Sequence, residues 1–284
     1  MEKIKMVAAM LIVGSIGIFV SNIPLPSSVI ACSRAVIGTI FLMMVLLIRK
    51  TKIKWNVFKN NWIYLLISGG ALGFNWIFLF EAYRYTSVAT ATLCYYMAPV
   101  FVILLSPIIL KEKLTILKIG CTITALIGAV LISGVFGNGG QDLRGIGFGL
   151  LAALLYSGII IVNRFIKDLS GVETTFCQLA ISAIIMIPYV TFTEDISIDF
   201  VSATTIILLL IVGIVHTGIV YILFFSAINK LPAQTSAILS YIDPVTAILL
   251  SGIFLKQAMG SVQIIGTILI LGSAMLNNIK TKED

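Results

Sequence analysis

Residues 73–112 of the chain, GFNWIFLFEAYRYTSVATATLCYYMAPVFVILLSPIILKE, return in altered form at residues 218–257, GIVYILFFSAINKLPAQTSAILSYIDPVTAILLSGIFLKQ. With a constant shift of 145 and no gap, 15 of the 40 aligned positions are identical. The matches include Gly73/Gly218, Tyr96/Tyr241, Pro99/Pro244 and Lys111/Lys256, which a shared excess of apolar residues does not explain. The chain is therefore predicted to consist of two similar halves, residues 1–140 and 141–284.

The composition indicates that these halves lie in a lipid bilayer. Of the 284 residues, 59% are apolar and 11% are charged, and the mean hydropathy is +1.10. Soluble domains are about 45–50% apolar and about 25% charged, and disordered chains combine low hydrophobicity with high charge. Both classes are excluded, and the expected fold class is an all-α polytopic membrane protein.

Ten apolar segments are each long enough to cross a bilayer, which takes about 20 residues per helix. They cover residues 4–22, 28–48, 61–82, 87–110, 114–136, 144–165, 172–192, 201–228, 233–255 and 261–279. Membrane β-strands are shorter and alternate apolar with polar residues. The continuous runs therefore predict ten transmembrane helices, whose backbone groups are all paired within the segment.

The basic residues are divided unevenly between the two sides of such a bundle. If the N-terminus is cytoplasmic, 15 of the 19 lysines and arginines fall in inside segments and 3 fall in outside segments. Cytoplasmic loops of membrane proteins carry this excess, so the net charge of +7 needs no nucleic acid partner. We expect a multi-pass protein of the bacterial inner (plasma) membrane with both termini in the cytoplasm.

Five helices per half is an odd number, so the second half enters the membrane from the opposite side. Inverted repeats of this kind are typical of secondary transporters. Two similar halves of opposite orientation can exchange conformations, which opens a central site first to one side and then to the other. The repeat therefore predicts alternating access around a site near the middle of the membrane.

Several motifs resemble those of the EamA-like family of the drug/metabolite transporter superfamily. They are FEAYRYTS at 80–87, YMAP at 96–99, KEKL at 111–114, YIDP at 241–244 and the isolated Arg34. Gln257 departs from the family, which often has Glu there. The resemblance covers nearly the whole chain. It implies ten helices in two inverted five-helix repeats, export of small metabolites, and a substrate site on the first, third, fourth, sixth, eighth and ninth helices.

Asp243 is the first candidate for contact with the substrate. It lies about halfway along the ninth apolar segment, immediately before Pro244, which removes a backbone donor and disturbs the preceding turn. A carboxylate at this depth is costly unless it has a partner, and it could bind a proton, a cation or a cationic substrate. The alternative is a structural carboxylate that is hydrogen-bonded to a neighbouring helix.

The other candidates are aromatic or polar residues in the same helices. Tyr95 and Tyr96 share a predicted helix face with Pro99, and Ser240 shares one with Asp243. The full set of further substrate-binding candidates is Tyr96, Tyr241, Tyr95, Trp76, Asn75, His216, Tyr221, Tyr156 and Ser240. Tyrosine rings suit an amphipathic solute or a cation. Helix packing is the alternative for the aromatic residues, and a neutral, hydrogen-bonded histidine is favoured over a proton relay at His216.

Four residues are assigned gating or structural roles. Glu81 and Arg34 lie toward the outer ends of their segments, and their depth predicts that they pair with each other. Pro99 and Pro244 disturb helices at equivalent positions of the two halves.

Motifs for chemistry on a substrate are absent from the sequence. H-E-x-x-H, G-x-x-x-x-G-K-[ST] and G-x-S-x-G do not occur, so we expect no enzyme, metal or cofactor, while proton coupling through Asp243 stays open. Glycines at G-x-x-x-G spacing predict packing within the bundle rather than dimerisation, and hence a monomer. Small amphipathic metabolites such as amino acids are the predicted substrates. Organic cations (quaternary amines) or drug-like solutes are the alternative, followed by a membrane scaffold or enzyme without transport.

Overall fold

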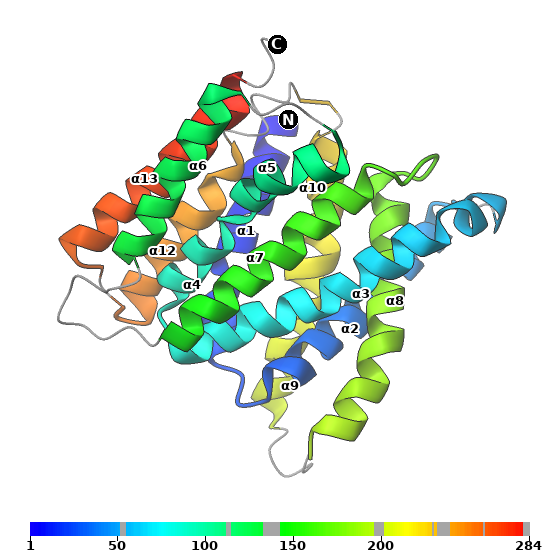
Figure 1. The fold of residues 1–284 in the computed structure, drawn as a ribbon. Coiled ribbons are helices and arrows are strands. Elements are labelled where there is room, and N and C mark those ends of the chain that lie inside the picture. The colour runs from blue at the N-terminus through cyan, green and yellow to red at the C-terminus, as the bar shows by residue number, and fades with distance from the viewer. Residues whose placement is uncertain are drawn as a thin grey trace.

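The computed structural model describes residues 1–51, 55–111, 115–132, 143–195, 202–228, 230–231, 239–257 and 259–280. Every regular element in these ranges is a helix (Figure 1), which confirms the all-α class. The first half contains α1 (Glu2–Ser21), α2 (Ser27–Ile48), α3 (Trp55–Tyr85), α4 (Val88–Tyr95), α5 (Ala98–Ile109) and α6 (Ile116–Ile132). The second half contains α7 (Leu143–Asn163), α8 (Gly171–Thr193), α9 (Ala203–Leu210), η2 (Ile211–Ile219), α10 (Val220–Ile228), α12 (Ile242–Phe254) and α13 (Ser261–Lys280).

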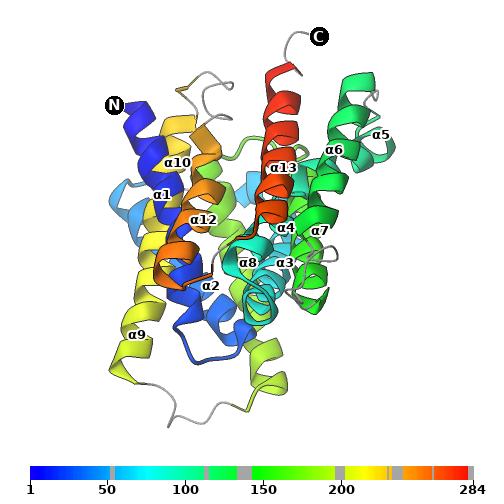
Figure 2. The ribbon, with the colours of Figure 1, turned by 90° about the vertical axis from the view of Figure 1, so that its left-hand side faces the viewer.

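These helices are long and apolar enough for a membrane. Within the described ranges, seven helical segments of at least 18 residues qualify as membrane spans, and three shorter apolar helices, Ile116–Leu131, Ile242–Phe254 and Ser261–Leu276, accompany them. Large apolar side chains point outward, including Phe192 (88% exposed) and Ile253 (69% exposed). An apolar exterior of this kind suits lipid rather than water. α1 begins and α13 ends on the same side of the bundle (Figures 1 and 2).

The two halves break their helices at related positions. α4 and α5 are separated by a turn at Tyr96, and α12 begins directly after the counterpart Tyr241. Pro99 and Pro244 follow each tyrosine by three residues. A proline lacks the N–H and clashes with the preceding turn, so the helix cannot run on undisturbed. The predicted span 87–110 therefore consists of two helices instead of one.

The ends of α5 and α12 are also alike. The caps Leu110 (φ −99°, ψ −5°) and Leu255 (φ −97°, ψ −1°) have nearly the same backbone angles. The next residues, Lys111 (φ 57°) and Lys256 (φ 54°), are both left-handed. All four positions are related by the shift of 145 residues, so the repeat in the sequence is also a repeat in backbone conformation.

Helices of one half contact helices of the other in matched pairs. α3 packs on α7 as α10 packs on α1, α3 packs on α8 as η2 packs on α2, and α5 packs on α7 as α12 packs on α1. α6 packs on α13, the last helix of the other half. Each pair has a counterpart in which the two halves exchange places.

Glycines allow several of these close contacts. Gly69 and Gly73 of α3 face α8, and Gly145 and Gly149 of α7 face the segment from Thr86 to Cys94. A Cβ atom added at any of the four would lie 2.5–2.9 Å from an atom of the facing segment. The predicted packing of these G-x-x-x-G pairs within the bundle is therefore confirmed.

The predicted span 201–228 contains a π-helix, η2, between α9 and α10. In η2 the side chains bond carbonyls five residues earlier: Thr217 Oγ1 donates to Val212 O over 3.0 Å, and His216 Nδ1 lies 3.4 Å from Ile211 O. π-helical turns are rare and occur frequently at functional sites. This one places His216 and Thr217 against α1 and α2.

Candidate functional site

A hydrogen bond between the two halves marks the interior of the bundle. Tyr96 caps the C-terminus of α4, and Asp243 lies in the first turn of α12. The Tyr96 hydroxyl donates to Asp243 Oδ2 over 2.6 Å, and the Ser240 carbonyl oxygen lies 3.5 Å from the same hydroxyl. Both residues lie at helix breaks, so the bond joins the two places where the related helices are interrupted.

Further tyrosines surround this bond. The Tyr95 ring lies 5.2 Å from the ring of Tyr156 on α7 and 6.5 Å from the ring of Tyr96. Asp243 is within electrostatic range of Tyr83 and Tyr156 as well as Tyr96. Tyr156 is 37% exposed and the other residues named here are half-buried. Tyr156 is therefore the most exposed residue of this group.

Arg34 of α2 provides a buried positive charge near the same tyrosines. Its side chain is 7% exposed. Nε donates to Thr217 Oγ1 over 2.8 Å, Nη2 donates to the His216 carbonyl oxygen over 3.4 Å, and the guanidinium carbon lies 3.9 Å from the centre of the Trp76 ring. Such stacking is a cation–π contact. Among the described residues, the salt bridges join other partners, so no carboxylate neutralises this guanidinium.

The charged residues and the tyrosines form one set. Tyr83 is within electrostatic range of both Arg34 and Asp243, and Arg34 also acts on Tyr95 and Tyr221. We call this set the central cluster; its members are Arg34, Trp76, Tyr83, Tyr95, Tyr96, Tyr156, Tyr221 and Asp243. They come from α2, α3, α4 with its cap, α7, α10 and α12, so both halves contribute.

His216 and Asn75 lie beside the central cluster and connect helices. His216 Nε2 lies 3.0 Å from Ser15 Oγ, and the histidine ring packs on Phe19 with 4.8 Å between ring centres, which ties η2 to α1. Asn75 Nδ2 donates to the Ala152 carbonyl oxygen over 2.6 Å. Asn75 Oδ1 is buried and has no hydrogen-bond partner in the described part of the chain. Asn75 thus has both a structural bond and an unused acceptor.

The predicted pair of Glu81 and Arg34 does not form. Glu81 Oε2 lies 3.6 Å from Nη1 of Arg84 and accepts a hydrogen bond from Ser27 Oγ over 2.6 Å. Arg34 lies about two helical turns beyond Ser27 on α2, where it reaches Thr217 instead. The gating or structural roles of Glu81, Arg34 and the two prolines stay predictions.

The remaining predicted residues lie near the start of α12. Tyr241 is the half-buried N-cap of this helix, and Ser240 contributes its carbonyl oxygen to Tyr96. The position of the first half that aligns with Asp243 is Ala98. The carboxylate is therefore a feature of one half only, and it breaks the symmetry of the repeat.

Sequence reasoning missed two members of this region, Tyr83 and Thr217. Trp76, Phe80 and Tyr83 fall at i, i+4 and i+7 on α3, and this spacing places three aromatic residues on one helix face. That spacing could have identified Tyr83. Thr217 carries no comparable signal, because its contact with Arg34 depends on the wider turn of η2.

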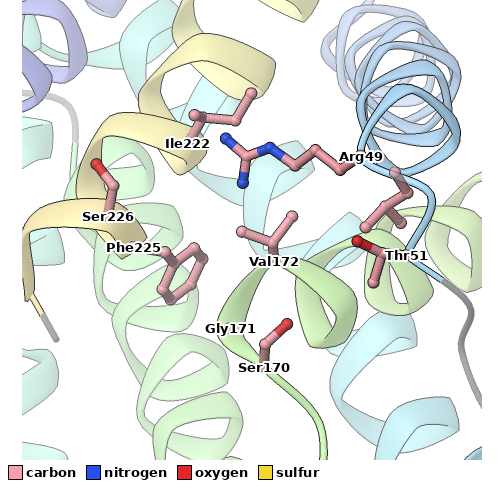
Figure 3. A pocket seen from close by; sticks show the side chains of 9 residues that line it. Arg49, Thr51, Ser170, Gly171, Val172, Ile222, Phe225 and Ser226 are labelled. Carbon is pink, nitrogen blue, oxygen red and sulfur yellow. The ribbon is translucent and has the colours of Figure 1, made fainter.

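A separate pocket of about 220 Å³ lies where α2 ends and α8 begins (Figure 3). The Arg49 side chain extends across it, above Val172 and toward Ile222. No member of the central cluster lines this pocket. At its edge, Ser170 and Glu173 form a capping box that already satisfies the start of α8, so the helix end offers few free donors.

The fold and the central cluster define a class: a multi-pass α-helical membrane protein with a polar, aromatic site built by two similar halves. A model of the EamA-like transporter family matches residues 3–134 and, a second time, residues 143–279. The chain belongs to the EamA-like transporter family and is a membrane transporter.

Individual relatives agree with this family. The uncharacterized transporter YxxF of Bacillus subtilis (strain 168) is 35% identical over 285 residues, which cover 98% of this chain and 89% of the relative. Protein PecM of Dickeya dadantii (strain 3937) is 24% identical and covers 76% of this chain and 74% of its own length. A crystal structure of a protein with 20% identity superimposes with a TM-score of 0.65 over 99% of this chain and 98% of its own. At that identity the superposition shows the fold alone.

Proposed function

We propose that this chain is a secondary transporter that exports small amphipathic metabolites such as amino acids by alternating access. The proposal includes ten membrane crossings in two inverted five-helix repeats, residues 1–140 and 141–284, in the bacterial inner membrane with both termini in the cytoplasm. It also includes action as a monomer without a metal or cofactor. The observation that carries it is the hydrogen bond of 2.6 Å between Tyr96 and Asp243, because the site around it is built by both halves.

The paired contacts between the halves support alternating access. Three helix pairs across the interface, α3 with α7, α3 with α8 and α5 with α7, have counterparts in which the halves exchange places. If each half adopted the other's present arrangement, the mirror set of contacts would form and the central cluster would face the opposite side. Inverted repeats in secondary transporters work in this way.

The chemistry of the central cluster suits a solute with an apolar part and a polar end. Tyrosine rings offer apolar faces, and their hydroxyls can donate or accept. Asp243 could bind an ammonium group of the solute or a proton, and the Tyr96 hydroxyl holds its Oδ2 when neither is bound. Proton coupling through Asp243 is part of this proposal.

A carrier for organic cations is the second candidate. The observation that favours it is the position of Asp243 among tyrosine rings, since cations bind both to carboxylates and over aromatic faces. The two candidates differ in the charge of the solute, and this difference can be tested directly.

Counterflow in proteoliposomes tests the proposed function. Vesicles that contain the purified protein and unlabelled leucine or phenylalanine are expected to accumulate the labelled amino acid transiently. Asp243→Asn and Tyr96→Phe should each reduce the initial rate at least about tenfold, the effect of losing one polar contact in a buried site. Tyr189→Phe is the matched control, because the 37%-exposed Tyr189 lies on α8 outside the central cluster. Counterflow of a quaternary amine without counterflow of any amino acid would favour the second candidate.

A further inference from the structure

The guanidinium of Arg34 has unused hydrogen-bonding capacity in the interior of the bundle. Nε donates to Thr217 and Nη2 donates to the His216 carbonyl, while Nη1 donates to none of the described residues. The Trp76 ring covers one face of the guanidinium, 3.9 Å from its carbon, and Phe80 lies further out at 5.9 Å. Within the part of the chain that the structure describes, one edge of this planar cation is therefore left without a partner.

Leaving this charge unpaired is unfavourable in such a place. A cation in the membrane interior is costly unless an anion or several dipoles compensate it. Two carboxylates of the described chain were candidates for a role in or beside the site, and both have other partners. Asp243 accepts a hydrogen bond from Tyr96, and Glu81 contacts Arg84 and Ser27. The partners of Arg34 within the protein are neutral oxygens and an aromatic ring.

We infer that Arg34 binds a carboxylate group of the transported molecule, an inference that rests on the function proposed above. A guanidinium presents its N–H groups in a planar fork that matches the two oxygens of a carboxylate. The contacts to Thr217 and Trp76 hold that plane in position before the solute arrives. The solute thus supplies the anion that the described residues do not.

The surroundings select a single carboxylate on an amphipathic solute. Arg34 is the one basic residue of the central cluster, so a doubly charged phosphate would remain half-neutralised. Tyr83, Tyr95 and Tyr221 lie within its electrostatic range and offer rings for the apolar part of the solute. An organic cation would meet the guanidinium as a like charge, which is repulsive at low dielectric. The transported class is therefore expected to be monocarboxylates, with amino acids among them, and not quaternary amines.

Trp76 provides a reporter for this test. The chain has three tryptophans, and the other two, Trp55 and Trp62, lie near the start of α3. In a Trp55→Phe, Trp62→Phe protein in lipid nanodiscs, Trp76 is the only tryptophan, and its fluorescence reports on the guanidinium stacked against it. The probes are matched sets that share one apolar group: leucine, isocaproate and isoamylamine, and phenylalanine, phenylpropionate and phenethylamine.

We expect a saturable fluorescence change with the amino acids and the acids, and at least about tenfold weaker binding of the amines. Arg34→Gln should weaken binding of the acids at least about tenfold and leave binding of the amines unchanged or improved. Arg84→Gln is the matched control: it makes the same substitution at an arginine that pairs with Glu81 outside the central cluster, and it should bind as the parent does. If Arg34→Gln unfolds at a much lower temperature than the parent, Arg34→Lys keeps the charge without the fork and should show intermediate binding.

Two results would overturn the inference. One is saturable binding of the amines with none of the acids. The other is equal binding of the acids by the parent and a folded Arg34→Gln protein. Counterflow of the same probes separates this inference from the proposed function. Acids that bind at Trp76 but show no counterflow would contradict transport and leave the carboxylate site standing. Counterflow of the acids that is unchanged in Arg34→Gln would contradict the carboxylate site and leave transport standing.

Discussion

At the scale of single residues, the central cluster holds one carboxylate and one guanidinium, and both are fixed by neutral partners. Tyr96 donates to Asp243, and Arg34 donates to Thr217 while stacking on Trp76. Neutral partners orient a charged group without cancelling its charge. In the function proposed here, both groups therefore remain available to a solute.

The Thr217 contact can be tested by an isosteric substitution. Thr217→Val keeps the shape but removes the acceptor of the Arg34 Nε donor, and both groups are buried. We expect a loss of about 1–3 kcal/mol in the free energy of unfolding, because a buried donor is left unpaired. Denaturant titration in mixed micelles measures it. Thr191→Val, whose exposed hydroxyl donates only to its own helix, should change stability little. An equal effect of the two substitutions would contradict a contribution of the Thr217–Arg34 hydrogen bond to the free energy of unfolding.

Two residues of the central cluster could be picked out from the sequence, one by the repeat and one by its depth in an apolar segment. Tyr96 emerged as one of the matched positions, and Asp243 as a carboxylate deep in an apolar segment. The position of Arg34 was misjudged, since hydropathy gives approximate depth but not the direction in which a helix face points. Seven residues along α2 separate the residue that binds Glu81, Ser27, from Arg34, and this distance decides which neighbour each one meets.

At the scale of elements, the length and class of most helices follow from apolar composition. The breaks and the π-helical turn within these helices do not follow from composition. The turn at Tyr96 could be predicted only from the position of Pro99, and η2 has no signal at all, since the difference between α and π turns lies in hydrogen-bond register. α3 also begins at Trp55, six residues before the predicted span 61–82, because polar residues near a membrane surface can continue a helix into water.

The left-handed residues after α5 and α12 give a matched pair of predictions. Lys111 (φ 57°) and Lys256 (φ 54°) adopt a conformation that costs a residue with a side chain more than glycine. Lys111→Gly and Lys256→Gly are each expected to raise the free energy of unfolding by about 0.5–1 kcal/mol. Lys59→Gly, an exposed position beyond the first turn of α3, should instead lower it by about 1 kcal/mol. A loss of stability in all three variants would contradict the assigned backbone.

The contact between α2 and η2 gives a second pair of predictions. A Cβ added at Gly213 of η2 would lie 2.5 Å from Cβ of Ile37, whereas a Cβ at Gly147 of α7 would meet nothing within 4 Å. Gly213→Ala is expected to lower the free energy of unfolding by about 1–3 kcal/mol through overpacking. Gly147→Ala should raise it by about 0.5–1 kcal/mol, because alanine favours the helix. Thermal unfolding with a tryptophan signal ranks the two variants, and the opposite order would contradict this packing.

At the scale of the whole molecule, the two halves share helix ends, breaks and contact partners, but they differ in chemistry. Asp243 in the second half faces Tyr96 of the first, while the position equivalent to Asp243 is Ala98. In the proposed mechanism, a symmetric framework exchanges conformations around an asymmetric site. The sequence repeat predicted the framework. The asymmetry and the contribution of Arg34 became visible only when the helices were placed against each other.

The central claim is that the central cluster opens in turn to each side of the membrane. Its most direct test is the reactivity of a single cysteine at Tyr156, which is 37% exposed. The variant is Tyr156→Cys in a protein whose four buried native cysteines are replaced by alanine. It is treated with a membrane-impermeant thiol reagent in right-side-out and in inverted vesicles. We predict labelling from both sides, with a transported solute slowing both reactions. Labelling from one side only, under all conditions, would contradict alternating access at this site.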